Sequence, residues 1–198
     1  MKPYAESCDQ NREPILDVLR PLFSTCSAVL EIGSGTGQHA VYFAARLPHL
    51  YWIPSDREEN LPGIALWREE ADLPNVQEPL ELDVTQKNWP QVDVQAVFSA
   101  NTTHIMSWQQ VQDLFRGVGE TLPEGGLFLL YGPFNYDGDY TSDSNRRFDA
   151  WLKARDPLSG VRDFEALDQL AIQAGMQLQD DIAMPANNRI LCWRKRSG

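Results

Sequence analysis

Residues 27–37 read SAVLEIGSGTG, a short apolar run that ends in three glycines spaced two residues apart. The apolar part, residues 27–32, is typical of a strand buried in a parallel sheet. The glycines permit positive φ angles and let a ligand approach the backbone closely. A helix is expected over residues 38–47. A glycine-rich turn between strand and helix favours a ligand site over a merely tight turn.

The rest of the chain alternates short strand-like runs with longer helix-like segments, which is the pattern of an α/β sheet. Further strands are predicted at 51–54, 78–82, 94–99, 126–131, 176–183 and 189–194, and helices at 14–23, 62–71, 108–122, 145–154 and 164–174, with a long polar loop at 132–143. The last two strands flank a five-residue turn, 184–188, and must therefore be antiparallel. We expect one α/β domain, 1–198, with a seven-stranded, mostly parallel sheet, a reversed last strand and helices on both faces.

The composition bounds the kinds of partner that the protein can have. The chain has 198 residues, 42% of them hydrophobic, and a formal net charge of −11. An acidic surface repels phosphate backbones, and no basic amphipathic stretch is present, so we expect neither a nucleic-acid nor a membrane partner. Scattered Cys8, Cys26 and Cys192 predict free thiols and no metal site. Free thiols favour a reducing, cytoplasmic environment, and residues 1–11 contain no apolar run, so no signal peptide is expected there.

Three carboxylates stand where they can select the ligand. Glu31 directly precedes the glycines, where it would repel a pyrophosphate but can accept a hydrogen bond from an amino group. Asp56 follows the second strand and can accept hydrogen bonds from two ribose hydroxyls. Asp83 follows the third strand and can reach an adenine amino group. A solvated loop aspartate at Asp56 and a turn or capping residue at Asp83 are the alternatives.

The stretch 29–37, together with Asp56 and Asp83, resembles the class I S-adenosylmethionine-dependent methyltransferases. A wider set of residues is similar to one small group, the domain-of-unknown-function 938 family of methyltransferase-like proteins. That set is Asn11, Pro14-Ile-Leu, Ser34-Gly-Thr-Gly-Gln-His39, Pro54-Ser-Asp56, Asn101 with His104, Tyr131-Gly-Pro-Phe134, Ser144-Asn145 and Met184-Pro-Ala-Asn-Asn188. The chain departs from the family at Gln10, where an arginine is expected.

The resemblance implies a Rossmann-like class I methyltransferase fold and S-adenosylmethionine as cofactor, with S-adenosylhomocysteine as product, but no particular reaction. The cofactor residues that it implies are Glu31, Gly33, Ser34, Gly35, Gly37, Asp56, Asp83, Val84 and Asn101. The glycine spacing, G-x-G-x-G, also differs from the G-x-G-x-x-G that is expected for dinucleotides. The closing hairpin is likewise unnecessary in a nicotinamide-binding domain, so an oxidoreductase is disfavoured.

Ligands of an open α/β sheet bind outside the carboxyl ends of its strands, where several distinctive side chains are expected. Asn101 and His104 follow the fourth strand and are the candidate catalytic residues. The pKa of histidine lies near neutrality, so His104 can act as a general base; packing beside Trp108 is the alternative. The run from Asn101 to His104 lacks the Asn-Pro-Pro-Tyr motif of amino-group methyltransferases.

The candidate substrate residues are Asn11, Tyr131, Phe134, Asn187 and Asn188. Each has a structural alternative: a helix cap at Asn11, a packed aromatic loop, and a turn at the asparagine pair. We expect Asn101, His104 and the 184–188 turn to face one pocket beside the cofactor methyl group. The sequence thus predicts a methyltransferase for a small molecule, a monomer or weak homodimer. The alternative is a non-catalytic protein that binds S-adenosylmethionine or S-adenosylhomocysteine.

Overall fold

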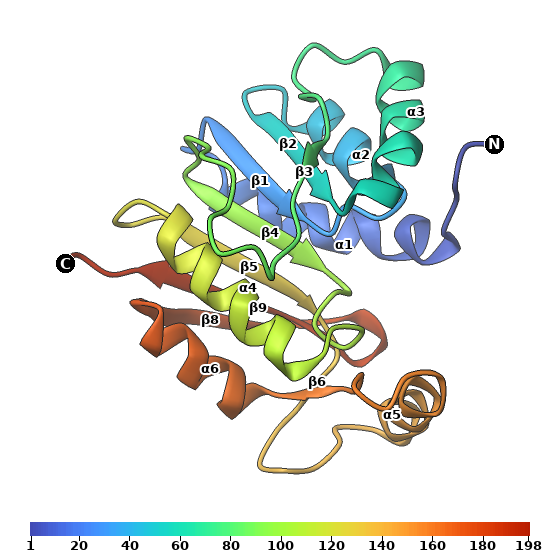
Figure 1. Ribbon diagram of the computed structural model, residues 1–198, viewed down its shortest axis with the longest axis vertical. Coiled ribbons are helices and arrows are strands. Elements are labelled where there is room, and N and C mark those ends of the chain that lie inside the picture. The colour runs from blue at the N-terminus through green and yellow to red at the C-terminus, as the bar shows by residue number, and fades with distance from the viewer. The chain divides into compact units, whose positions relative to one another are not determined.

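The computed structural model describes all residues, 1–198, and shows alternating strands and helices (Figure 1). In chain order these are α1 (Glu6–Leu22), β1 (Ala28–Ile32), α2 (Gln38–Arg46), β2 (Tyr51–Asp56), α3 (Leu61–Ala71), β3 (Leu80–Glu81), β4 (Ala96–Ala100), α4 (Trp108–Thr121), β5 (Leu127–Gly132), β6 (Phe134–Asn135), α5 (Asp143–Arg155), β7 (Arg162–Asp163), α6 (Phe164–Gln173), β8 (Met176–Met184) and β9 (Asn188–Lys195). None of the helices combines the length and the apolar composition that a membrane span needs.

The seven-stranded sheet has the order β3-β2-β1-β4-β5-β9-β8. β1 pairs in parallel with β2 and β4, and β2 pairs in parallel with β3. β9, the last strand of the chain, is antiparallel to both β5 and β8. The prediction of a mostly parallel sheet with a reversed last strand is therefore confirmed. The chain divides into two compact units, residues 1–99 and 100–198, and a single domain stays a prediction.

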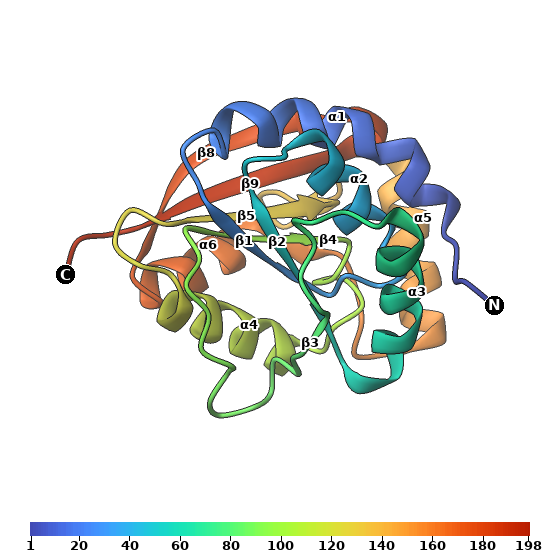
Figure 2. The same ribbon diagram turned by 90° about the horizontal axis from the view of Figure 1, so that it is seen from above.

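In the first unit, aromatic side chains join α2 to the strands. All five residues of β1 are buried. The ring of Phe43 on α2 lies 5.5 Å from that of Trp52 and 5.8 Å from that of Phe98, between centroids. α1 lies beside α2 (Figure 2) and buries Ile15, Leu16 and Leu19. This packing fixes β1 and α2, the two elements that the glycine turn connects.

The prediction that the first helix begins at Pro14 is wrong, because α1 begins at Glu6. The side chain of Gln38 accepts from the Ala5 N–H at 2.7 Å and donates to the Ala5 carbonyl at 3.2 Å. Two acidic residues in the first turn also favour the helix dipole. The contact with Gln38 is distant in sequence, which is why local signals placed the start at the proline. Burial of the apolar face offsets the cost of a proline inside the helix, which is about 3 kcal/mol.

In the second unit, α4 and α6 lie together on one face of β5, β9 and β8 (Figure 1 and Figure 2). The rings of Phe115 and Trp193 are 5.3 Å apart, and Trp193 donates a 2.9 Å hydrogen bond to Asp168 of α6. The predicted antiparallel hairpin is confirmed, but its turn is shorter than predicted, because Met184 and Asn188 pair as the last and first residues of β8 and β9. The predicted polar loop at 132–143 is not wholly irregular, because β6 within it pairs with β7.

Candidate functional site

The glycine turn after β1 adopts the left-handed backbone that its sequence predicts. Gly33, Gly35 and Gly37 have φ angles of 70°, 59° and 93°. A Cβ atom on Gly37 would lie 3.0 Å from Cα of Ile64, closer than nine in ten real Cβ contacts. Both the backbone angle and the neighbouring helix therefore favour glycine at this position.

Glu31 lies at the end of β1 and is almost fully buried, with 1% of its surface exposed. Its Oε1 atom accepts hydrogen bonds from Ser34 Oγ at 2.8 Å and from the Trp52 indole at 3.2 Å. Burial raises the pKa of Glu31 to about 7, against these two bonds, which lower it. A buried carboxyl with so high a pKa gains stability when a cationic group such as an ammonium binds beside it.

Asp56 is the last residue of β2 and directly contacts the glycine turn. Its Oδ2 atom accepts from the Gly35 N–H and its Oδ1 atom from the Arg57 N–H, each at 2.8 Å. Each carboxylate oxygen accepts more than one hydrogen bond, so both can still receive a ribose hydroxyl. Asp56 is thus not a free loop residue, although its binding of a ribose stays a prediction.

Asp83 is engaged in a local turn beyond β3. Its Oδ1 atom accepts from the backbone N–H of Thr85 at 2.9 Å and from its hydroxyl at 2.7 Å, and both bonds lower the pKa of Asp83. The neighbouring Val84 is buried, and its carbonyl accepts from Trp89. Asp83 is thus a turn residue, which is the alternative to a ligand contact. Contact of Asp83 or Val84 with an adenine stays a prediction.

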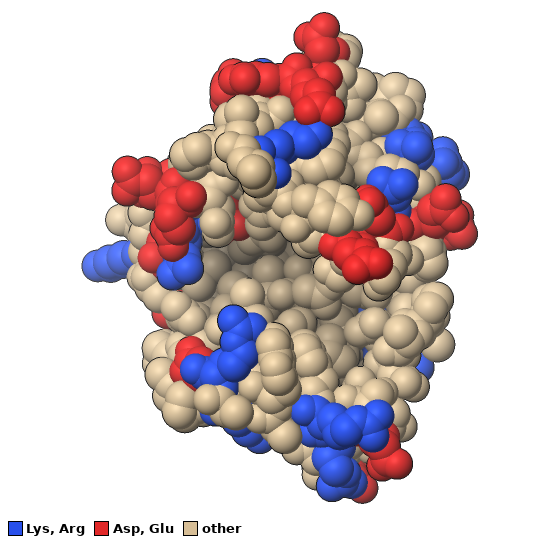
Figure 3. Space-filling model, turned by 90° about the vertical axis from the view of Figure 1, so that its right-hand side faces the viewer, with Lys and Arg blue, Asp and Glu red and all other residues tan.

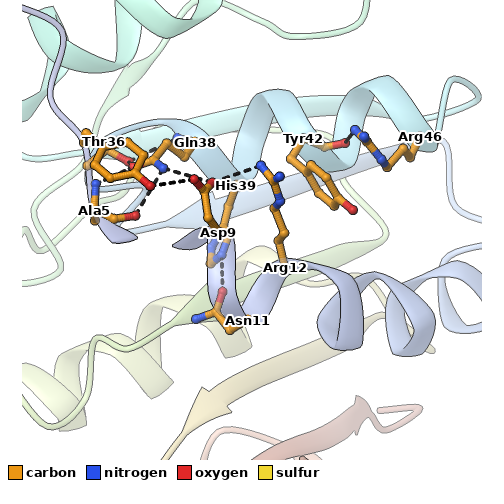
Figure 4. A network of polar contacts seen from close by, with 10 residues as sticks. Ala5, Asp9, Asn11, Arg12, Thr36, Gln38, His39, Tyr42 and Arg46 are labelled. Atoms are coloured by element: carbon orange, nitrogen blue, oxygen red, sulfur yellow. Dashed lines mark hydrogen bonds and ion pairs between the residues drawn. The ribbon is translucent and has the colours of Figure 1, made fainter. Parts of the chain in front are cut away.

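A polar network joins α1 to the start of α2 (Figure 4). The side-chain oxygen of Asn11 lies 2.7 Å from Nε2 of His39, which is 6% exposed. Burial lowers the pKa of His39 to about 4, so the ring is neutral at pH 7 and lies within hydrogen-bond distance of Asn11. Asn11 lies inside α1, so the helix-cap interpretation is wrong. Its role toward a substrate stays a prediction.

We expect Asn11→Ala to lower the free energy of unfolding by about 1–3 kcal/mol, because the buried ring nitrogen of His39 would lose its hydrogen-bond partner. Chemical denaturation measures this effect. The matched control is Gln10→Ala, an exposed neighbour on the same helix, which should change stability by less than about 0.5 kcal/mol. Equal stability of the two variants would show that the contact between Asn11 and His39 contributes nothing.

In the second unit, the two predicted catalytic residues lie together over Gly132. Asn101 follows β4 with a left-handed φ of 57°, and its N–H donates to the Tyr131 carbonyl at 3.0 Å. A Cβ atom on Gly132 would lie 3.9 Å from Nδ1 of His104 and 4.0 Å from Oδ1 of Asn101. Gly132 therefore adds no side-chain atom beside either polar atom.

His104 is 6% exposed, and the centroid of its ring lies 5.2 Å from that of Phe148 on α5. The alternative to a catalytic role is packing of His104 beside Trp108, but the aromatic ring that packs against His104 is that of Phe148. Burial, and secondarily the positive charge of Arg162, lower the pKa of His104 to about 4. The guanidinium of Arg162 donates to the carbonyl oxygens of Thr103 and Met106 on either side of the histidine. The imidazole is thus neutral at pH 7 and held by its neighbours.

α5 links His104 to the closing hairpin, and only part of this link has a sequence signal. The Asn145 side chain donates to the Asn187 carbonyl at 3.3 Å, and Asn187 donates to Ser144 Oγ at 3.4 Å. Phe148, one turn further along α5, contacts His104. Residues 144 and 145 belong to the family resemblance, whereas nothing in the sequence pattern singles out Phe148 or Arg162.

The remaining predicted substrate residues are tied into the second unit. Tyr131 and Phe134 are buried. A Cβ atom on Gly132 would lie 3.6 Å from Cζ of Phe134. Tyr136 donates to Asp181 at 2.7 Å, and Tyr140 donates to Asp149. The hydroxyls of both tyrosines are thus held by carboxylates of the second unit, and whether this loop forms part of a substrate pocket stays a prediction. In the hairpin, Asn187 has a left-handed φ of 59°, as the turn alternative requires, and Asn188 does not.

The buried titratable groups predict how stability depends on pH. The pKa values of His39 and His104 lie at about 4, below the usual 6.5, so the unfolded chain binds more protons between these values. The free energy of unfolding should therefore fall as pH falls from 6.5 to 4. Glu31 has the opposite effect on the free energy of unfolding between pH 4.5 and pH 7. Its raised pKa keeps it protonated in the folded state in this range, whereas the unfolded chain has lost the proton.

Glu31→Gln should therefore steepen the fall by about 1 kcal/mol per pH unit. Urea denaturation of both proteins across this pH range measures the two slopes. Equal slopes would show that Glu31 titrates as an ordinary exposed glutamate.

Solved structures with this fold include several methyltransferases. An O-methyltransferase family protein from Burkholderia thailandensis aligns with a TM-score of 0.83 and 15% identity, over 94% of this chain and 56% of that one. The S-adenosylmethionine-dependent methyltransferase SibL aligns with a TM-score of 0.81 and 21% identity, over 96% of this chain and 56% of that one. An O-methyltransferase family 2 protein from Planctomyces limnophilus, in complex with apigenin, aligns with a TM-score of 0.80 and 19% identity, over 93% of this chain and 56% of that one.

The chain thus spans slightly more than half the length of these proteins, and at such identities the likeness shows the common fold. The family model described as "Protein of unknown function (DUF938)" matches residues 2–195, nearly the whole chain. With its class I methyltransferase-like fold, the protein belongs to this DUF938 family.

Proposed function

We propose that the protein is an S-adenosylmethionine-dependent methyltransferase that acts on a small molecule. The observation that carries the proposal is the contact between Asp56 at the end of β2 and the Gly35 amide of the glycine turn. Beside this turn, the carboxyl of buried Glu31 is suited to the cationic amino group of the methionine part. Asp56 is suited to the ribose hydroxyls. These contacts support a nucleoside with an amino-acid tail as the ligand.

The reaction would need little from the protein beyond alignment. When bound, S-adenosylmethionine would supply the methyl group to the attacking acceptor, and S-adenosylhomocysteine would leave with the electron pair of the broken carbon–sulfur bond. The sulfonium methyl group is already activated, so orientation and exclusion of water supply most of the catalysis. An attacking hydroxyl becomes strongly acidic as its oxygen takes the methyl group. A weak base such as neutral His104 is then sufficient to take the proton.

Two features support a small acceptor with an oxygen nucleophile. The solved relatives in fold include O-methyltransferase family proteins, one of them bound to apigenin. The net charge of −11 disfavours a nucleic acid. On the face drawn in Figure 3, acidic and basic side chains are interspersed around uncharged surface. We propose that the protein works as a monomer or weak homodimer without a macromolecular substrate.

A non-catalytic binder of S-adenosylmethionine or S-adenosylhomocysteine is the second candidate. It is favoured by the pKa of His104, which burial lowers to about 4 and which makes this residue a weak base. Both candidates predict cofactor binding, and they differ only in methyl transfer.

A screen with methyl-labelled S-adenosylmethionine separates the two candidates. The protein is incubated with the labelled cofactor and a small-molecule extract, and the label in the low-molecular-weight products is measured. We expect label transfer that depends on the protein and is lost in Asp56→Ala, which should bind the cofactor poorly. Cofactor binding without transfer to any extract would contradict the methyltransferase and leave the non-catalytic binder.

A further inference from the structure

A cavity of about 330 Å³ opens beside the closing hairpin of the second unit. Its lining residues are Tyr136, Thr141, Ala183, Met184, Asn187, Asn188 and Arg189. This volume lies at the lower end of the range for small-molecule sites, which is roughly 300–1,000 Å³. Apolar groups of Ala183 and Met184 and the ring of Tyr136 are combined here with side-chain amides. Such a lining suits one end of a small organic molecule.

Arg189 is the only charged residue that lines this cavity. Its Nε–H donates to Asp181 Oδ1 at 2.7 Å, and one terminal nitrogen donates to the Asp181 carbonyl at 3.2 Å. Asp181 itself does not line the cavity, and its other carboxylate oxygen accepts from Tyr136. Asp181 and the Tyr136 hydroxyl therefore hold the guanidinium in place, and the remaining N–H groups of Arg189 are available for a ligand.

The asparagine amides add donors to the same cavity. Asn188 Nδ2 donates to the Pro185 carbonyl at 3.3 Å, and Asn187 Nδ2 donates to Ser144 at 3.4 Å. Each amide nitrogen carries a second hydrogen that these bonds do not use. A fixed guanidinium with neighbouring amide donors is complementary to a carboxylate, which only accepts hydrogen bonds.

Gly132 connects the cavity-lining residue Arg189 to His104. Gly132 of β5 pairs directly with Arg189 of β9, so a side chain at position 132 would point to the same face as that of Arg189. A Cβ atom on Gly132 would lie 3.9 Å from Nδ1 of His104. Gly132 thus relates the imidazole of His104 to the face of the sheet that carries Arg189.

We infer that this cavity is the acceptor-recognition site and that it binds a carboxylate group of the acceptor through Arg189, with Asn188 beside it. The reacting hydroxyl of the same molecule then lies over Gly132, toward His104. The inference names the substrate class of the proposed methyltransferase, a small hydroxylated carboxylic acid, and in that respect rests on the proposed function. Binding of the carboxylate itself requires neither cofactor nor methyl transfer.

Benzoate and its neutral isostere benzamide test the inference on the full chain without cofactor. In ¹H–¹⁵N spectra, benzoate should cause saturable shifts of the side-chain amides of Asn187 and Asn188, and benzamide should not. Arg189→Gln should weaken benzoate binding by about tenfold or more, since it removes charge-assisted hydrogen bonds. The control Arg194→Gln removes the same charge from an exposed position on β9 and should leave binding unchanged.

Arg189→Lys keeps the positive charge next to Asp181 and covers the case in which the glutamine variant does not fold. It should fold and bind benzoate more weakly than the wild type, because lysine lacks the planar guanidinium. Absence of saturable shifts with benzoate, or equal binding of benzamide, would overturn the inference. A protein that binds benzoate at these residues but no S-adenosylmethionine would retain the carboxylate site and refute the proposed function.

Discussion

Asp56→Ala should weaken the binding of S-adenosylhomocysteine at least tenfold. Two ribose hydroxyls would each lose a hydrogen bond to a carboxylate, and such bonds contribute roughly 1.5–3 kcal/mol each. The substitution also removes the acceptor of the Gly35 N–H, so the glycine turn would lose the contact that ties it to β2. Both effects act in the same direction on cofactor affinity. Isothermal titration calorimetry measures the change directly.

Asp56→Asn separates these two effects, because its amide oxygen can still accept from Gly35 while the charge is lost. It should bind more tightly than the alanine variant and more weakly than the wild type. Asp93→Ala removes an exposed aspartate of the same unit and should leave affinity unchanged. Equal affinity of Asp56→Ala and the wild type would show that this carboxylate only stabilises the turn.

His104→Gln should lower turnover by roughly 10²-fold or more once an acceptor is identified, because a general base contributes at least that factor. Glutamine preserves much of the volume and some hydrogen bonding but cannot take the proton. Because the pKa of His104 lies at about 4, the wild-type rate should not change through titration of this group near neutral pH, and should fall as pH approaches 4. Initial rates at saturating cofactor measure both effects.

Phe148→Leu is a useful companion variant, since it removes the ring that packs against His104 without changing the imidazole itself. Its turnover should fall less than that of His104→Gln. Unchanged turnover in His104→Gln would leave alignment alone as the source of catalysis.

The sequence predicts the parts of the fold that depend on local patterns. The apolar run before three glycines specifies β1, the turn and α2, because positive φ angles at these positions require glycine. The five-residue turn near the C-terminus predicts the antiparallel pair β8 and β9, since no crossover can form over so short a connection. Both features could therefore be read without knowledge of tertiary contacts.

The start of α1 and the surroundings of His104 could not be predicted in this way. Residues distant in the sequence determine both: Gln38 binds the first residue before α1, and Phe148 packs on the imidazole. The local turn at Asp83 was an open alternative, because an aspartate followed by a threonine two residues later suits a turn as well as a ligand contact. Tertiary contacts account for the first two differences, whereas the turn at Asp83 is local.

The most direct test of the central claim is calorimetric titration of the purified protein with S-adenosylhomocysteine, S-adenosylmethionine and, for comparison, NAD. The account predicts binding of the first two in the micromolar range or tighter, roughly −8 kcal/mol, and no binding of NAD. Clear binding of NAD, with no heat from either S-adenosyl compound, would contradict it.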